Sequence, residues 1–205
     1  MDITFLGRGL VMGFAIAAPV GAIGLLCVRR TLTEGRLVGF VSGLGAATAD
    51  ALYGFLAAMG LRSVSSVLIE HQGWVRLIGG LFLCYLGVRT AMTHPSAEAA
   101  APSGRGLAIV YGSTFALTLT NPSTIISFAA VFAGLGLVDT AAGRWSAGLL
   151  VLGVFLGSAL WWLLLSSAVG CFRRSLSPSR LRRVNLLSGA ALAGFGLFAL
   201  LSIRG

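Results

Sequence analysis

Asp50 is the residue of this sequence with the clearest chemical potential, because it is the only charge in the apolar stretch 37–61. A carboxylate at the centre of a membrane span costs roughly 2.5–3.5 kcal/mol on insertion scales, so by default it faces the protein interior and is functional. Removal from water favours its protonated form, whereas a nearby cation favours the ionised form. Asp50 could therefore hold either a proton or a substrate ammonium group. The alternative is a structural aspartate bonded to Thr48, Tyr53 or a neighbouring helix.

Two proline-containing segments, 18–21 and 121–124, interrupt apolar stretches near their middle. A proline inside a helix removes a hydrogen bond and costs about 3 kcal/mol or more. Lipid offers no water to the freed carbonyl, so each break is expected to face protein or a polar cavity. The exposed N–H groups of broken helices can hold a carboxylate, although the Asn-Pro segment could also be a simple kink.

These features define one predicted binding site for a substrate and a proton. Tyr53 follows Asp50 by three residues and lies on the same helix face. Ser158 lies near Trp161 and Trp162 in a related region of the second half, where the tryptophans are better explained by packing. The predicted site residues are Asp50, Asn121, Pro19, Gly21, Pro122, Ser123, Thr124, Thr48, Tyr53 and Ser158.

The composition indicates that the bilayer is the solvent of this chain. Of 205 residues, 57% are hydrophobic and 10% are charged, and the mean hydropathy is +0.93. A span needs about 20 apolar residues, and six stretches approach that length: 3–28, 37–61, 73–92, 106–138, 145–172 and 184–203. The predicted fold is all-α, with six transmembrane helices. The third stretch is the least regular, because Arg76 and Arg89 must reach outward from it.

The two halves of the chain resemble one another, which predicts a repeat of three helices. Gly80, Leu83 and Gly87 match Gly189, Leu192 and Gly196 at an offset of 109 residues, and the two proline segments match at 103. Three helices per half would place the second copy upside down in the membrane, as in inverted-repeat transporters. The predicted organisation is a first repeat over 1–92, a cytoplasmic linker over 93–105 and a second repeat over 106–205.

The charges predict orientation rather than nucleic-acid binding. All 15 basic residues are arginines, and the net charge is +9. Ten of them, including Arg29 and Arg30, fall on the side of the linker in the predicted topology, and five fall on the other side. By the positive-inside rule the arginine-rich loops are expected in the bacterial cytoplasm, with both termini outside the inner membrane.

Other residues predict neither an enzyme nor a cofactor. Cys27, Cys84 and Cys171 have no CxxC spacing, and no Ser-His-Asp set, phosphate loop or metal-binding cluster is recognisable. The pairs Gly39/Gly43 and Gly153/Gly157 have GxxxG spacing, which allows a homodimer but more often serves packing within one bundle.

Four runs of the sequence, two in each half, carry a family resemblance. The run Ala18-Pro19-Val20-Gly21 to Leu32, the run Gly43 to Gly54 and the pair Leu117 to Pro122 with Phe128 to Gly136 resemble the lysine exporter (LysE) family of translocators. The resemblance covers essentially the whole chain. It implies an inner-membrane exporter of amino acids or related metabolites, driven by the proton-motive force, and it marks Pro19, Gly21, Asp50, Asn121 and Pro122. Many relatives carry a second proline where this chain has Ala22.

The sequence therefore predicts a proton-coupled exporter of an amino-acid-like solute that works by alternating access. The alternative is a divalent-cation exporter of similar topology, although a single membrane acid offers fewer ligands than a metal site usually needs.

Overall fold

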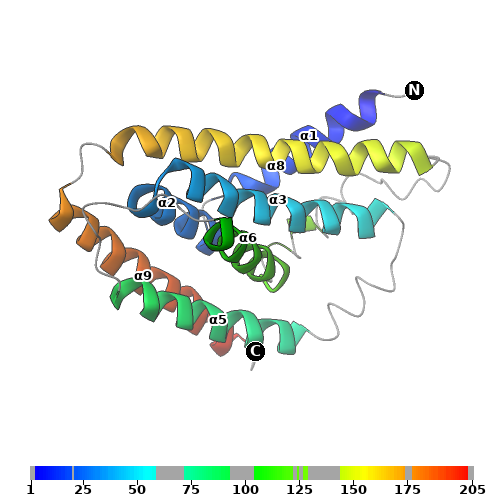
Figure 1. The fold of residues 1–205 in the computed structure, drawn as a ribbon. Coiled ribbons are helices and arrows are strands. Elements are labelled where there is room, and N and C mark those ends of the chain that lie inside the picture. Colours follow the sequence, from blue (N-terminus) through cyan, green and yellow to red (C-terminus); the bar gives the residue numbers. More distant parts are fainter. Residues whose placement is uncertain are drawn as a thin grey trace.

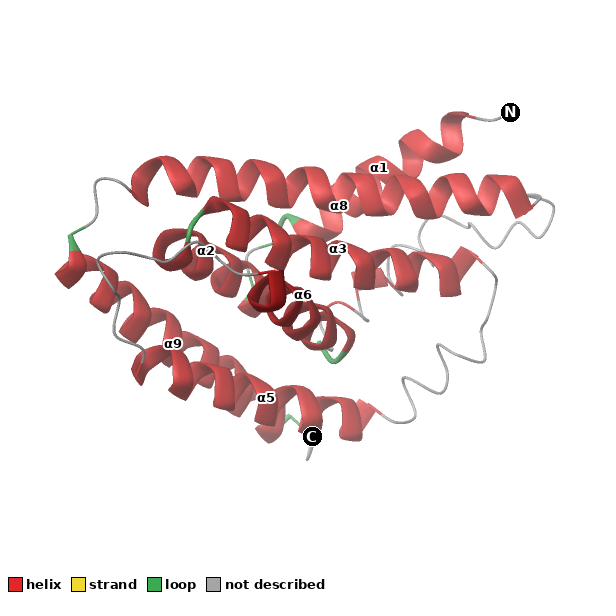
Figure 2. Cartoon of the chain, viewed as in Figure 1, coloured by secondary structure: helices red, strands yellow, loops and turns green. Residues whose placement is uncertain are grey.

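The computed structural model describes residues 3–19, 21–58, 72–92, 104–121, 124, 127–128, 144–173 and 177–202. Within these ranges the chain forms helices and no strand, which confirms the all-α prediction (Figure 2). The helices are α1 (Ile3–Ala17), α2 (Ala22–Glu34), α3 (Arg36–Ala58), α5 (Gln72–Met92), α6 (Gly104–Leu119), α8 (Arg144–Arg173) and α9 (Pro178–Leu201).

Three of these helices, α3, α8 and α9, contain a stretch long and apolar enough to cross a membrane. The pair formed by α1 and α2 adds a fourth span if it is counted as one helix, bent by 80°. The apolar stretch of α6, Gly106–Leu119, is shorter. Six spans therefore stay a prediction, whereas the described residues contain three or four candidate spans. Much of the predicted fourth span, including 129–138, lies outside the described residues.

Helix ends follow local sequence signals. Gly35 has a φ of 111°, a left-handed conformation that favours glycine, and it joins α2 to α3. Ser177 caps α9 by accepting a hydrogen bond from the Arg180 N–H, and Pro178 follows at the first helical position. The reversal at Gly35 places α2 beside α3.

The helices pack in pairs that cross between the two halves of the sequence. In Figure 1, α1 lies along α8, α3 lies between α8 and α6, and α5 lies along α9. The short helix α2 packs against α3, α8 and α9. A buried cluster that includes Leu26, Ala47, Leu117, Trp162 and Leu192 fills the space among these helices. Large apolar side chains such as Leu81, Leu187 and Phe172 cover the exterior, as expected for lipid contact.

Glycines set the closest approaches between helices. An added Cβ at Gly9, Gly13, Gly153 or Gly157 would collide with backbone atoms across the α1–α8 interface. Gly80 lies against Gly196, and Gly87 against Gly189, where α5 meets α9. Small residues permit such approaches between membrane helices. Both GxxxG pairs are in contact with residues of this same chain, and homodimerisation stays a prediction.

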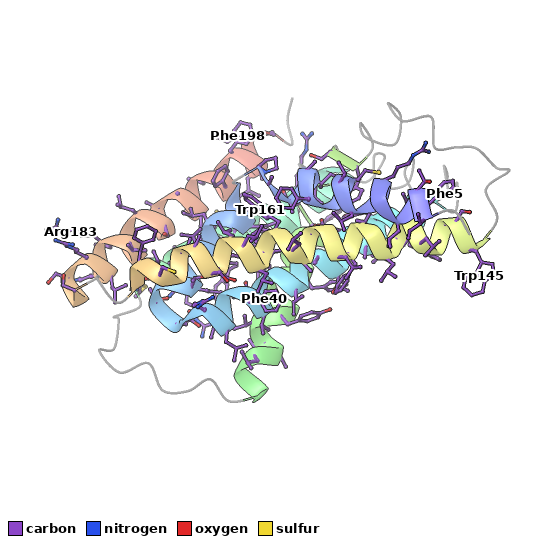
Figure 3. All side chains as sticks on the ribbon, turned by 90° about the horizontal axis from the view of Figure 1, so that it is seen from above. Phe5, Phe40, Trp145, Trp161, Arg183 and Phe198 are labelled. Carbon is purple, nitrogen blue, oxygen red and sulfur yellow. The ribbon has the colours of Figure 1, made fainter. Side chains whose placement is uncertain are left out.

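Arg29 and Arg30 are not loop residues, which corrects the sequence prediction. They belong to the last turns of α2 and are 8% and 7% exposed. The apolar stretch ends at Val28, but the helix continues to Glu34 because the arginines find polar partners inside the bundle. Arg183, by contrast, lies at one end of the molecule, and Trp145 lies at the other end (Figure 3).

Gly157→Leu is expected to separate α1 from α8 and to lower the apparent melting temperature in detergent by several degrees. A leucine at this position has no space beside Leu10 and Phe14, and overpacking typically costs about 1–3 kcal/mol. Gly148→Leu in the same helix is the matched control, since a Cβ there meets nothing within 4 Å. Equal melting temperatures for the two variants would contradict this packing.

Candidate functional site

The first predicted interruption separates α1 from α2. Helix α1 ends at Ala17, Pro19 follows, and α2 begins at Ala22 at a steep angle to α1. Gly21 is the N-cap of α2 and offers no side chain to bond the first N–H groups. Because the first N–H groups of a helix have no partner within it, the start of α2 presents hydrogen-bond donors and a positive dipole end.

The second interruption follows α6, which ends at Leu119. The Asn121 N–H donates to the Thr118 carbonyl at 3.2 Å, and the Asn121 side-chain amide donates to the Thr124 hydroxyl at 3.1 Å. The hydroxyl of Tyr53 donates to the Leu119 carbonyl at 2.6 Å. A side chain of α3 thus satisfies a backbone acceptor that the end of the helix leaves open.

Asp50 lies on α3 and is 3% exposed. The Ser158 hydroxyl of α8 donates to the Asp50 carboxyl Oδ2 at 2.7 Å, and the Trp162 indole N–H donates to the Ser158 oxygen at 3.2 Å. Among the described residues, no arginine lies within ion-pair distance of Asp50. A carboxylate has about four acceptor positions, so one serine donor leaves capacity for a further ligand.

One cavity of about 470 Å³ brings Asp50 and both interruptions together. Its volume lies within the range of roughly 300–1,000 Å³ found for small-molecule sites. Five predicted site residues line it: Pro19, Gly21, Asp50, Asn121 and Thr124. Predicted site residues separated by up to 105 positions in the chain therefore share one chamber.

The remaining predicted site residues differ in their placement. Ser158 contacts Asp50 without lining the cavity. Thr48 and Tyr53 do not line it either, and their part in binding stays a prediction. Thr48 donates to the Leu44 carbonyl and accepts from Tyr111, and Tyr53 reaches the end of α6. Each side chain points to α6 because that helix packs beside α3. Pro122 and Ser123 lie outside the described residues.

Sequence reasoning missed several residues that line the cavity. Arg76, Trp162, Phe195 and Phe198 contribute from α5, α8 and α9. Arg76 was expected to reach outward, but it is half-buried, lines the cavity and donates to the Ser202 carbonyl. The sequence did contain a signal for Arg76. A charge within an apolar stretch indicates a functional residue that faces the protein interior, and this argument applies to Arg76 as it does to Asp50.

A network of hydrogen bonds surrounds Arg30, which lies further along α2 than the residues that line the cavity. One Arg30 nitrogen donates to the hydroxyls of Ser42 and Thr114, each at 2.7 Å, and to the Val110 carbonyl at 3.1 Å. The other donates to Ser113 at 2.9 Å. These bonds connect α2 with α3 and α6 through neutral acceptors.

Arg29 extends these connections to α9. Its Nε donates to the Asn185 side-chain oxygen at 3.0 Å, and it forms an ion pair with Glu34 at 3.3 Å. A buried guanidinium needs such partners to offset its desolvation. The two arginines therefore fix the end of α2 within the bundle.

The divalent-cation exporter stays an alternative prediction, which the described ranges do not test. They contain no group of three or more His, Cys, Asp or Glu residues that could hold a metal ion. The cavity's charged lining consists of Asp50 and Arg76.

The chain is similar to known proteins over most of its length. The family model described as LysE type translocator matches residues 14–203, a range that includes Asp50 and both interruptions. YcgF of Bacillus subtilis (strain 168), which is named for amino acid efflux, is 25% identical over 194 residues, with 92% of this chain and 91% of the relative covered. No solved structure matches the chain.

Two further relatives cover shorter ranges. YahN of Escherichia coli (strain K12), named as an uncharacterized membrane protein, is 27% identical over 181 residues, with 86% of this chain and 80% of the relative covered. The threonine efflux protein of Salmonella typhi is 30% identical over 152 residues, with 66% of this chain and 70% of the relative covered.

Ser158→Ala is expected to destabilise the protein through Asp50. A hydrogen bond to a charged group contributes about 1.5–3 kcal/mol, so the loss should lower the apparent melting temperature in detergent. In an Asp50→Asn background the same change should cost less, and a double-mutant cycle measures the difference.

Ser166→Ala is the control for this cycle, because the buried Ser166 hydroxyl donates to the Leu163 carbonyl within α8. If Ser158→Ala lowers the melting temperature equally in the wild-type and Asp50→Asn backgrounds, the contact between Ser158 and Asp50 is contradicted.

Proposed function

Because the chain belongs to the LysE type translocator family, we propose that it exports amino acids or related small metabolites across the bacterial cytoplasmic membrane. Members of the family are transporters, and two of the relatives above are named for efflux. The observation that carries the proposal is the cavity in which Asp50 meets both helix interruptions. Transporters with broken helices bind solutes at such interruptions.

Asp50 is the proposed coupling residue. Its carboxyl is buried, accepts one hydrogen bond from Ser158 and faces the cavity. A protonated Asp50 leaves the chamber without a negative charge, whereas an ionised Asp50 attracts an ammonium group. Binding of the solute's amino group would then release the proton, and protonation from the opposite side would release the solute.

The two interruptions are proposed to hold the polar groups of the solute. The first turn of α2 lines the cavity with Ala22, Ile23 and Gly24, whose N–H groups lie at the positive end of the helix. Asn121 and Thr124 add an amide and a hydroxyl from the second interruption. These donors suit a carboxylate or another acceptor group.

Alternating access requires a barrier on one side of the cavity, and the Arg30 network supplies a candidate. The cavity contacts the first turn of α2, whereas Arg30 lies at least six residues further along, about 9 Å at 1.5 Å per residue. On α9 the cavity contacts residues 195–202, whereas Asn185 lies near the other end. The arginines thus close the bundle at the side away from the chamber.

The packing of glycines supports the proposed six-helix inverted repeat. The 109-residue offset between the halves relates Gly80 to Gly189 and Gly87 to Gly196. The contact Gly80–Gly196 therefore corresponds to the contact Gly87–Gly189 when the two halves are interchanged. A two-fold axis between α5 and α9 would produce this exchange. With the arginine-rich ends in the cytoplasm, the cavity would face outward in the conformation described, and the Arg30 network would be the cytoplasmic barrier.

Asp50→Asn is expected to insert normally and to abolish efflux driven by a pH gradient in proteoliposomes, because the amide cannot exchange a proton. The measurement is the initial efflux rate of a labelled amino acid with and without the gradient. Leu52→Ala, on an exposed position of the same helix, is the control. Full gradient-driven efflux by Asp50→Asn would remove Asp50 from the coupling mechanism.

Ser42→Ala combined with Thr114→Val is expected to weaken the barrier, because the two hydroxyls accept the shortest Arg30 hydrogen bonds. Cys27 is 2% exposed and borders the network, with its thiol hydrogen-bonded to Ser42, so it is a native reporter of this region. With Cys84 and Cys171 replaced by serine, alkylation of Cys27 by N-ethylmaleimide should accelerate about tenfold, as expected for a loss near 1.4 kcal/mol.

Thr33→Ala is the control for this experiment, since the Thr33 hydroxyl donates to the Arg29 carbonyl within α2. An unchanged alkylation rate in the double variant would show that these bonds do not close the pathway.

A further inference from the structure

The cavity contains a second charge, contributed by Arg76 of α5. We infer that Arg76 binds the carboxylate of the exported solute, so that Arg76 and Asp50 together select zwitterionic α-amino acids with an uncharged, apolar side chain. This inference rests on the proposed export function and deepens it by naming the substrate class.

The position of Arg76 suits direct contact with a solute. It lies in the second turn of α5, is half-buried, and lines the same chamber as Asp50. One of its nitrogens donates to the backbone carbonyl of Ser202, which holds the side chain toward α9. A guanidinium has five N–H donors in a planar fork whose geometry matches a carboxylate.

Asp50 and Arg76 form separate poles of the chamber. They are its two charged residues among the described lining, and they come from different helices. The polar partner of Asp50 is Ser158 and not Arg76. An α-amino acid carries an ammonium and a carboxylate on one carbon, so it can satisfy both poles at once. Each attraction is strengthened because the surroundings have a lower dielectric constant than water.

The wall around these poles is mainly apolar. Ile16, Leu83, Trp162, Phe195 and Phe198 line the chamber beside the two charges. Burial of an apolar side chain against them is favourable by roughly 25 cal/mol per Å² of area removed from water. A solute with a branched aliphatic side chain therefore fits this wall better than one with a charged side chain.

The same arrangement disfavours two related classes of solute. An amine without a carboxylate would leave Arg76 without its proposed ligand. A dibasic amino acid such as lysine would bring a second ammonium group into a chamber whose described lining offers one carboxylate and one guanidinium. Repulsion by Arg76 makes that combination unfavourable.

The test compares L-leucine with isoamylamine, which is leucine without its carboxylate, and with L-lysine. Each compound is assayed by counterflow in proteoliposomes that contain the wild-type protein, Arg76→Gln, Arg76→Lys or Arg8→Gln. Arg8 is exposed on α1, over the Phe5 ring, and controls for loss of one arginine away from the chamber. Size-exclusion profiles check folding.

In Arg76→Gln the half-saturating leucine concentration is expected to be at least about tenfold higher than in the wild-type protein. This is the effect expected for the loss of a hydrogen bond to a charged group. Isoamylamine counterflow should change little, Arg76→Lys should retain part of the leucine affinity, and Arg8→Gln should behave as wild type. Equal effects of Arg76→Gln on leucine and isoamylamine, or no effect on either, would overturn the inference.

The outcomes for the wild-type protein separate this inference from the export proposal. Exchange of leucine at lower concentrations than isoamylamine and lysine supports the inference. Exchange of lysine but not leucine overturns it while leaving amino acid export standing. Exchange of none of the three, and of no amino acid in a wider panel, removes both proposals.

Discussion

Asp50 has to be kept inside a hydrocarbon layer, where a carboxylate is stable only if protein surrounds it and supplies hydrogen bonds. The helices around it meet this requirement in detail. Ser158 of α8 donates to the carboxyl, Trp162 donates to Ser158, and the breaks after α1 and α6 open toward the same chamber. Each break exposes backbone groups that would be as costly in lipid as the carboxylate. Gathering these groups around one cavity satisfies them together and leaves a polar site inside an apolar bundle.

Close packing on either side of the chamber makes this arrangement possible. Glycines let α1 approach α8 and let α5 approach α9, so the chamber is enclosed by two tightly packed pairs. The arginines of α2 also hold helices together, but through hydrogen bonds, since Arg30 connects α2 to α3 and α6. Glycine contacts cannot open without loss of packing, whereas hydrogen bonds to hydroxyl groups can exchange partners with water or a solute. The structure thus combines rigid helix pairs with one region, around Arg30, that is suited to rearrangement.

The sequence predicted the features whose placement in lipid has the highest free-energy cost. Helical structure, the breaks near Pro19 and Asn121 and the burial of Asp50 follow from the cost of charges and open backbone in lipid. It could not show which way a long side chain turns, because that depends on helices distant in sequence. Arg76 faces the chamber since α9 offers it a carbonyl, and Arg30 is buried since α6 offers it hydroxyls. Thr48 and Tyr53 bond to residues of α6 for the same reason, because α6 packs on that side of α3.

The central claim is that Asp50 is a protonatable group in a chamber shared with the solute. Carbodiimide labelling tests it most directly, because dicyclohexylcarbodiimide enters membranes and reacts with protonated carboxyl groups. Mass spectrometry of the wild-type protein in native membranes should find the adduct on Asp50, and a saturating concentration of exported amino acid should suppress it. A protein that transports the amino acid but leaves Asp50 unlabelled, or labels it equally with and without the solute, would contradict the account.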